Sequence, residues 1–139
     1  MLKMIKILLV EDSKFLRIAT ERALSRAGYT MISAADGEQA LRLARQHTSD
    51  LMLLDMLLPK MSGLDVLKAL KSDPATQAIS VVVMTGMSQK NAARLEHDGA
   101  CGFLEKSNLQ LDQGADKLLL ALREIIQELP SRRTPSTSA

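Results

Sequence analysis

The stretch LMLLDMLLPKMSGLDVL, residues 51–67, contains the local pattern on which the fold depends. It begins with an uninterrupted aliphatic run, Leu51–Leu54, which is typical of a strand buried on both faces of a parallel sheet. Asp55 follows this run, and helical periodicity then extends over residues 64–71 until Asp73–Pro74, where proline prevents the helix from continuing. The stretch therefore predicts one β-strand followed by one α-helix.

The same unit recurs on both sides of this stretch. Aliphatic runs of strand length occur at Ile5–Val10, Thr30–Ala34, Ser80–Met84 and Gly102–Leu104, and segments with helical periodicity lie between them. Strands that alternate with helices are typical of a parallel sheet with helices on both faces. The sequence thus predicts a doubly wound α/β fold with a five-stranded parallel sheet and five helices.

Each of the other four predicted helices carries its own signals. The first ends before Gly28 and has a helical stripe formed by Phe15, Ile18, Ala19, Arg22, Ala23 and Ala27. Asp36 is the predicted N-cap of the second helix, whose Ala40, Leu41 and Ala44 should face inward. The fourth, Gln89–His97, is mostly polar and should pack lightly. The last ends at Pro130 and has an apolar stripe formed by Leu118, Leu122, Ile125, Ile126 and Leu129.

Composition limits the classes of protein to which the chain can belong. Its 139 residues fit one domain, predicted over residues 1–130, and the Ser/Thr/Pro-rich segment 131–139 is predicted to be a disordered tail or a truncated linker. A net charge of +2 with both signs dispersed does not indicate a nucleic-acid partner. Met1–Val10 is too short to span a bilayer, and the single cysteine, Cys101, fits a reducing compartment. We therefore expect a cytoplasmic protein without a membrane segment.

The residues that follow the predicted strands are the candidates for function. Ligands of open α/β sheets bind at the carboxyl ends of the strands. At these ends lie five reactive side chains, those of Glu11, Asp12, Asp55, Thr85 and Lys106. Three clustered carboxylates repel one another unless a cation offsets their charge, and a site made only of oxygen ligands suits Mg²⁺ or Mn²⁺. The pattern therefore predicts a divalent metal site at this edge of the sheet.

The same residues indicate phosphoryl transfer. A carboxylate such as Asp55 can attack phosphorus and form an aspartyl phosphate. Lys106 can pair with a phosphate or with Asp55 itself, and the hydroxyl of Thr85 can donate a hydrogen bond to a phosphoryl oxygen. The work of the protein in such a reaction is to position groups and neutralise charge.

Four stretches, KILLVEDS, LMLLDMLLPKMSGLDVL, VVVMTG and GACGFLEK, resemble the receiver domain of two-component response regulators, the CheY-like family. The resemblance covers residues 4–129 and implies the strand order 2-1-3-4-5. It also implies a signalling phosphoacceptor, not an enzyme acting on outside substrates. The implied partners are a histidine kinase or histidine phosphotransfer protein as donor and a downstream protein, and a phosphorylation-dependent dimer is compatible with it.

The resemblance further implies a role for each site residue. Asp55 is the implied phosphoacceptor. Glu11 and Asp12 are the implied acidic pair for the metal, with Asp12 bound directly and Glu11 through water, and the backbone carbonyl of Leu57 faces the same ion. Lys106 is the implied contact to the phosphoryl group. Two further residues form the implied switch, the hydroxyl residue Thr85 and the aromatic residue Phe103.

One position departs from the family pattern. The family usually has proline directly after the lysine, often with a cis bond, whereas Ser107 stands here. A cis bond before a non-proline residue costs about 3–4 kcal/mol, so we expect a trans bond. The segment Ser107–Gly114 is also longer than usual before the last helix. Both features make the loop that carries Lys106 the least predictable part of the site.

Two other classes of function are compatible with parts of the pattern. An aspartate-based phosphatase normally has a second Asp two residues after its nucleophile, and Leu57 occupies that position here. A receiver-like or flavodoxin-like binding module without phosphorylation is the other alternative. A flavodoxin-like site would need a Gly-rich or Ser/Thr-rich phosphate loop after the first strand, which is missing.

Overall fold

The computed structural model describes residues 4–86, 96–109 and 114–129. Five parallel strands form one sheet in the order β2-β1-β3-β4-β5. The strands are β1 (Lys6–Val10), β2 (Thr30–Ala34), β3 (Leu51–Asp55), β4 (Ser80–Thr85) and β5 (Gly102–Glu105). The predicted sheet and its order are confirmed, and each strand lies within one residue of its predicted limits.

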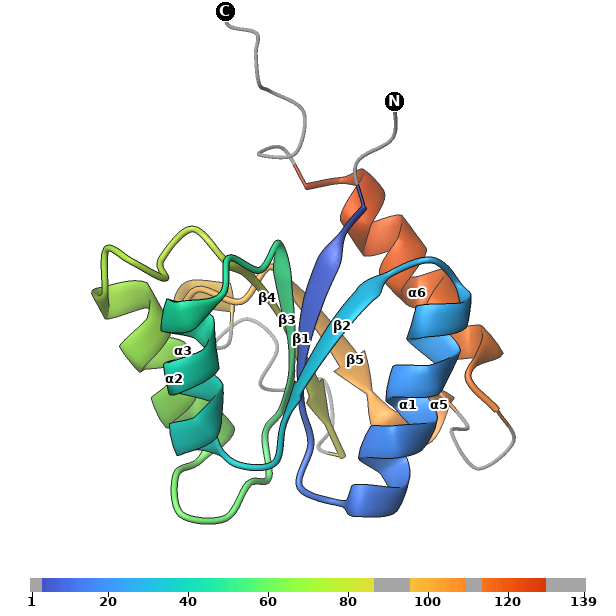
Figure 1. The fold of residues 1–139 in the computed structure, drawn as a ribbon, viewed down its shortest axis with the longest axis horizontal. Helices are drawn as coiled ribbons and strands as arrows, with labels where there is room; N and C mark the ends of the chain where they lie inside the picture. Colours follow the sequence, from blue (N-terminus) through green and yellow to red (C-terminus); the bar gives the residue numbers. More distant parts are fainter. Residues whose placement is uncertain (1–3, 87–95, 110–113, 130–139) are drawn as a thin grey trace, which may run out of the picture.

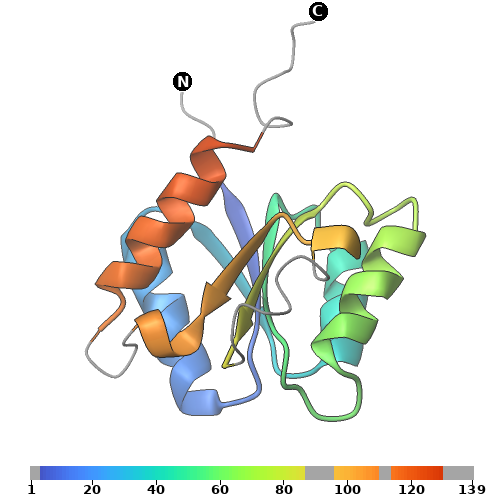
Figure 2. The same ribbon diagram turned by 180° about the vertical axis from the view of Figure 1, so that it is seen from behind.

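Helices cover both faces of the sheet, as Figure 1 shows. The helices α2 (Gly37–Gln46) and α3 (Gly63–Ser72) lie on one face, and α1 (Lys14–Arg26) and α6 (Asp116–Gln127) lie on the other. A short helix, α5 (Lys106–Leu109), follows β5 directly and can be seen from behind in Figure 2. None of the helices in the described part of the chain has the length and apolar character needed to cross a bilayer.

Two apolar clusters lie on opposite sides of the sheet. Alternate strand residues such as Leu8 and Val10 pack toward α2 and α3, whereas their neighbours Ile7 and Leu9 pack toward α1 and α6. Successive side chains of a strand point to opposite faces, so a strand buried on both faces needs apolar residues at every position. This requirement explains why the strands are continuous aliphatic runs.

The helix limits agree with the local signals. Asp36 is the N-cap of α2, because its Oδ1 accepts a hydrogen bond from the backbone N–H of Gln39 at 2.8 Å. Ala40 and Ala44 are buried, as predicted, and Leu118 and Leu122 are fully buried on α6. These contacts confirm the inward faces that the sequence predicts for both helices.

The stripe predicted for the first helix is not its buried face. Thr20 and Leu24 are the buried residues of α1, and the side chain of Phe15 is 79% exposed. Four members of the predicted stripe are small or polar (Ala19, Arg22, Ala23 and Ala27), so they define no strong apolar direction. The position of the sheet instead sets the inward face of α1, and Leu24 fills the space between this helix and the sheet.

Two helices differ from the prediction: the predicted helix Gln89–His97 and the short helix α5. The predicted helix Gln89–His97 lies outside the described residues except for its last two residues, Glu96 and His97, which are helical. The helix α5 was not predicted from the sequence. No cis peptide bond occurs in the described ranges, and the predicted tail, residues 131–139, lies outside them.

Candidate functional site

The three predicted carboxylates lie at one end of the sheet. Glu11 and Asp12 follow β1, and Asp55 is the last residue of β3. One carboxylate oxygen from each of the three lies within 4.8 Å of the other two. Glu11 and Asp55 are each only 3% exposed, whereas Asp12 is exposed. The site is therefore a buried acidic pair with a third carboxylate at its opening.

Lys106 supplies the opposite charge. Its ammonium donates to Oδ2 of Asp55 at 2.8 Å and to Oε1 of Glu11 at 3.2 Å. It is the first residue of α5, directly after the carboxyl end of β5. The structure thus places the predicted lysine between the two buried carboxylates, although they are 51 and 95 residues away in the sequence.

The pKa values of two of these groups depend on each other. Burial raises the pKa of Glu11 above its ordinary value of 4.5, the charge of Asp55 adds to this rise, and the Ser13 N–H and Lys106 oppose it. Burial acts to lower the pKa of Lys106, but its bonds to Asp55 and Glu11 outweigh burial and raise that pKa above 10.5. Lys106 is therefore a full positive charge at neutral pH.

Two residues behind the acidic pair were not predicted to take part. The backbone N–H of Ser13 donates to Oε2 of Glu11 at 3.1 Å. Nη1 of Arg17, on α1, donates to the backbone carbonyl of Glu11 at 3.0 Å and to that of Asp12 at 3.4 Å. Both contacts hold the loop between β1 and α1. In the sequence, these two contacts could have been recognised only from a serine N-cap, Ser13, followed one turn later by a basic residue, Arg17.

The backbone around Asp55 is tightly constrained. The N–H of Leu57 donates to Oδ1 of Asp55 at 3.1 Å, and the N–H of Gly63 donates to the carbonyl of Met56 at 3.1 Å. A Cβ atom at Gly63 would lie 2.6 Å from Cα of Met56 and 2.7 Å from the carbonyl oxygen of Asp55. Only glycine allows the start of α3 to come this close to the strand that carries Asp55. The metal-facing role of the Leu57 carbonyl stays a prediction.

Thr85 and Phe103 lie on neighbouring strands. Thr85 is the buried last residue of β4, and Phe103 pairs with Val83 across β4 and β5. Because side chains alternate along a strand, Thr85 shares the face of Val83, and Phe103 packs against the same cluster. Both side chains therefore belong to the face of the sheet that α2 and α3 cover.

The donor set fits a hard divalent cation. The carboxylates of Glu11, Asp12 and Asp55 are all oxygen ligands, and among the described residues no His or Cys joins this group. Mg²⁺ prefers one or two protein carboxylates together with water and phosphate oxygens. Asp12 is exposed, so a cation held here would remain open to solvent and to a phosphoryl group.

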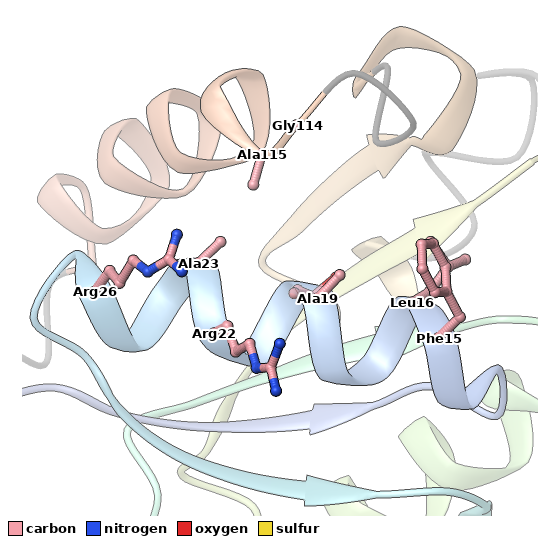
Figure 3. A pocket seen from close by; sticks show the side chains of 9 residues that line it. Phe15, Leu16, Ala19, Arg22, Ala23, Arg26, Gly114 and Ala115 are labelled. Atoms are coloured by element: carbon pink, nitrogen blue, oxygen red, sulfur yellow. The ribbon is translucent and has the colours of Figure 1, made fainter.

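A hollow between α1 and the residues that precede α6 has a different chemistry from the acidic site. It has a volume of about 360 Å³ and runs along α1 from Phe15 to Arg26, with Gly114 and Ala115 opposite (Figure 3). Apolar side chains, one threonine and two arginines, Arg22 and Arg26, line it. It contains none of the three carboxylates, so the chemistry of the acidic site does not extend into it.

The chain matches the response regulator receiver domain family over residues 7–118. It is 36% identical over 121 residues to the gliding motility regulatory protein of Myxococcus xanthus, a match that covers 84% of the chain but only 15% of that protein. It is 35% identical over 95 residues to the polar-differentiation response regulator DivK of Brucella anthropi, covering 68% of the chain and 77% of DivK. The chain spans 57% of another relative, from Pseudomonas aeruginosa.

Solved structures give the same result. The chemotaxis response regulator CheY4 of Vibrio cholerae superimposes with a TM-score of 0.79 at 28% identity, over 88% of this chain and 99% of that one. A CheY-like receiver domain protein from Methanospirillum hungatei has a TM-score of 0.78 at 24% identity, over 91% and 96% of the two chains, and shows the fold alone. On its family match, its sheet order and these relatives, the chain belongs to the response regulator receiver domains of two-component systems, which have the CheY-like fold.

Proposed function

We propose that this receiver domain accepts a phosphoryl group on Asp55 in a reaction that requires Mg²⁺. The observation that carries the proposal is the convergence of Glu11, Asp12 and Asp55 within 4.8 Å, with the ammonium of Lys106 2.8 Å from Asp55. The parallel sheet brings these strand ends to one edge, but the stability of the fold does not require three carboxylates there, and their mutual repulsion costs free energy. A cation-dependent reaction of an anionic group explains the arrangement.

In the proposed reaction, a carboxylate oxygen of Asp55 forms a bond to phosphorus while the P–N bond of a phosphohistidine breaks. The imidazole leaves with the electron pair of that bond. Lys106 holds the attacking carboxylate and then neutralises phosphoryl oxygens, and the hydroxyl of Thr85 donates to one of them. When bound by Glu11, Asp12, Asp55 and the Leu57 carbonyl, Mg²⁺, or Mn²⁺, would supply positive charge for the phosphoryl oxygens.

The proposed donor is a histidine kinase or a histidine phosphotransfer protein. Asp55 is almost fully buried, so the donor must contact the edge of the sheet around it. Two large apolar side chains flank this edge: Phe15 on the first turn of α1, and Leu57, which is 70% exposed. We propose that the donor covers both, because exposed apolar side chains beside a buried reactive group favour a protein partner.

We also propose that phosphorylation changes a face used by a downstream partner. The phosphoryl group would draw the Thr85 hydroxyl toward Asp55 and leave space into which Phe103 turns. This would alter the face built from the predicted helix Gln89–His97, β5 and α6. The shared sheet face of Thr85 and Phe103 supports this coupling. We expect the ring signals of Phe103 to shift in NMR spectra when Asp55 is phosphorylated, and unchanged signals in a fully phosphorylated sample would contradict the switch.

The test of the proposed function is the intact mass of the chain after incubation with acetyl phosphate. We expect a gain of one phosphoryl group with Mg²⁺ and none with EDTA. Binding of Mg²⁺ alone, measured by titration calorimetry, serves as the control for the metal site. No mass gain together with no Mg²⁺ binding would contradict the proposal and favour a receiver-shaped binding module.

A phosphatase that acts on outside substrates is less well supported. That reaction needs a general acid to protonate the leaving group, normally two residues after the nucleophile. Leu57 occupies this position, and its side chain cannot donate a proton. We therefore propose a signalling phosphoacceptor that catalyses only its own phosphorylation and dephosphorylation, and we expect it to act in the cytoplasm.

A further inference from the structure

The position of the Lys106 ammonium depends on one short segment. The side chain of Lys106 is 26% exposed, and its nitrogen contacts both buried carboxylates of the site. Lys106 is, however, the first residue of α5, a helix of only four residues that ends at Leu109. The direction in which Lys106 leaves the backbone is therefore set by the orientation of this single turn.

A single helical turn is not stable without contacts to other parts of the protein. The first turn of a helix fixes about three residues for one hydrogen bond, so an isolated turn is unstable. Ser107 follows Lys106, so no proline ring restricts the backbone there either. β5 fixes the start of this turn, because Glu105 is paired with Thr85, and the remaining constraint on its orientation comes from packing against the rest of the domain.

That packing is provided by Leu109. Its side chain is 5% exposed and belongs to the apolar cluster between the sheet and the helices α1 and α6, together with Leu118 and Leu122 of α6. Residues three apart on a helix lie on the same side of it, so the burial of Leu109 fixes the rotation of the turn at Lys106.

We propose that Leu109 is a positioning residue for Lys106: its insertion into the core holds α5 so that the ammonium reaches Asp55 and Glu11. The inference rests on the proposed function of Asp55, and it assigns part of the reactivity of the site to a buried leucine that touches none of the reacting atoms. Loss of the anchor releases the turn, and misplacement of a catalytic group by about 1 Å can slow a reaction by up to about a hundredfold.

The chain offers a matched control for this leucine. Leu129 is also a leucine, has the same 5% exposure and belongs to the same apolar cluster, but it follows α6, which carries no residue of the candidate site. We expect Leu109→Ala and Leu129→Ala to destabilise the domain to similar extents. Only Leu109→Ala should slow phosphorylation by acetyl phosphate, by about tenfold or more, in saturating Mg²⁺ and at a temperature where circular dichroism shows both variants folded.

A double-mutant cycle separates positioning from a general loss of packing. In a Lys106→Met background, Leu109→Ala should slow phosphorylation by less than about twofold, because the group that it positions is gone. Equal slowing by Leu109→Ala with and without Lys106 would overturn the proposal, as would equal slowing by the two alanine variants. If Leu109→Ala does not fold, Leu109→Val takes its place in the same cycle.

A second measurement does not depend on phosphorylation. Lys106, held by two carboxylates, should react slowly with a small N-hydroxysuccinimide ester, as followed by peptide mass spectrometry. We expect Leu109→Ala, but not Leu129→Ala, to speed acylation of Lys106 severalfold at equal folded fraction. If the wild-type chain accepts no phosphoryl group, the proposed function fails, yet this measurement still decides whether Leu109 holds Lys106. Unchanged acylation would overturn the inference alone.

Discussion

Replacing Asp55 with asparagine is expected to abolish phosphorylation of the domain, because an amide oxygen is not a nucleophile for phosphorus at neutral pH. The substitution preserves the shape of the side chain. Its amide oxygen can still accept the hydrogen bond that Oδ1 of Asp55 receives from the N–H of Leu57 at 3.1 Å. We therefore expect a folded domain that gains no mass from acetyl phosphate in the presence of Mg²⁺.

The matched control is Asp65→Asn, which removes the charge of an exposed aspartate on α3. This variant should gain one phosphoryl group at the wild-type rate. Peptide mapping of the wild-type protein after borohydride trapping should place the modification on Asp55. Phosphorylation of Asp55→Asn at a rate near that of the wild type would mean that another residue is the acceptor.

Lys106→Met should have the second-largest effect, on both rate and stability. Removing a single charged donor that stabilises developing charge typically slows a reaction by about a hundredfold or more, so we expect phosphorylation to slow at least about tenfold. Without metal, the free energy of unfolding at pH 7 should fall by about 1–3 kcal/mol, because Glu11 and Asp55 stay buried without a counter charge. Chemical denaturation and the mass assay measure the two effects.

Mg²⁺ distinguishes this explanation from a simple loss of packing. A cation bound to the carboxylates replaces part of the missing charge, so saturating Mg²⁺ should stabilise Lys106→Met more than it stabilises the wild type. The control Lys117→Met removes an exposed lysine on α6 and should change neither rate nor stability measurably. A Lys106→Met variant as stable and as fast as Lys117→Met would show that the ion pairs contribute nothing.

Much of the fold could be predicted because its signals are local. Each strand is a short aliphatic run, and Asp36 and Gly28 mark helix ends by chemistry that acts within a few residues. The convergence of Glu11, Asp12, Asp55 and Lys106 could be predicted for a related reason. Parallel strands present their carboxyl ends at one edge, so any reactive residue that follows a strand is brought to that edge.

The errors occurred where local signals are weak. Half of the stripe on the first helix is alanine, and its large apolar members, Phe15 and Ile18, do not form the buried face. The sheet decides that face, since it offers space to Thr20 and Leu24. The helix α5 was missed because four residues carry too little periodicity to be recognised.

The sequence by itself determined the order of the strands and of the longer helices in the described part of the chain, and it named the carboxylates and the lysine that meet at the candidate site, because these follow from runs and spacings along the chain. Only the tertiary structure decided how those groups pair. Lys106 reaches Asp55 and Glu11 from far away in the sequence, Arg17 holds the Glu11 backbone, and Leu109 enters a core built by α6. Such contacts depend on the relative placement of whole elements, which packing of the core sets and no local pattern records.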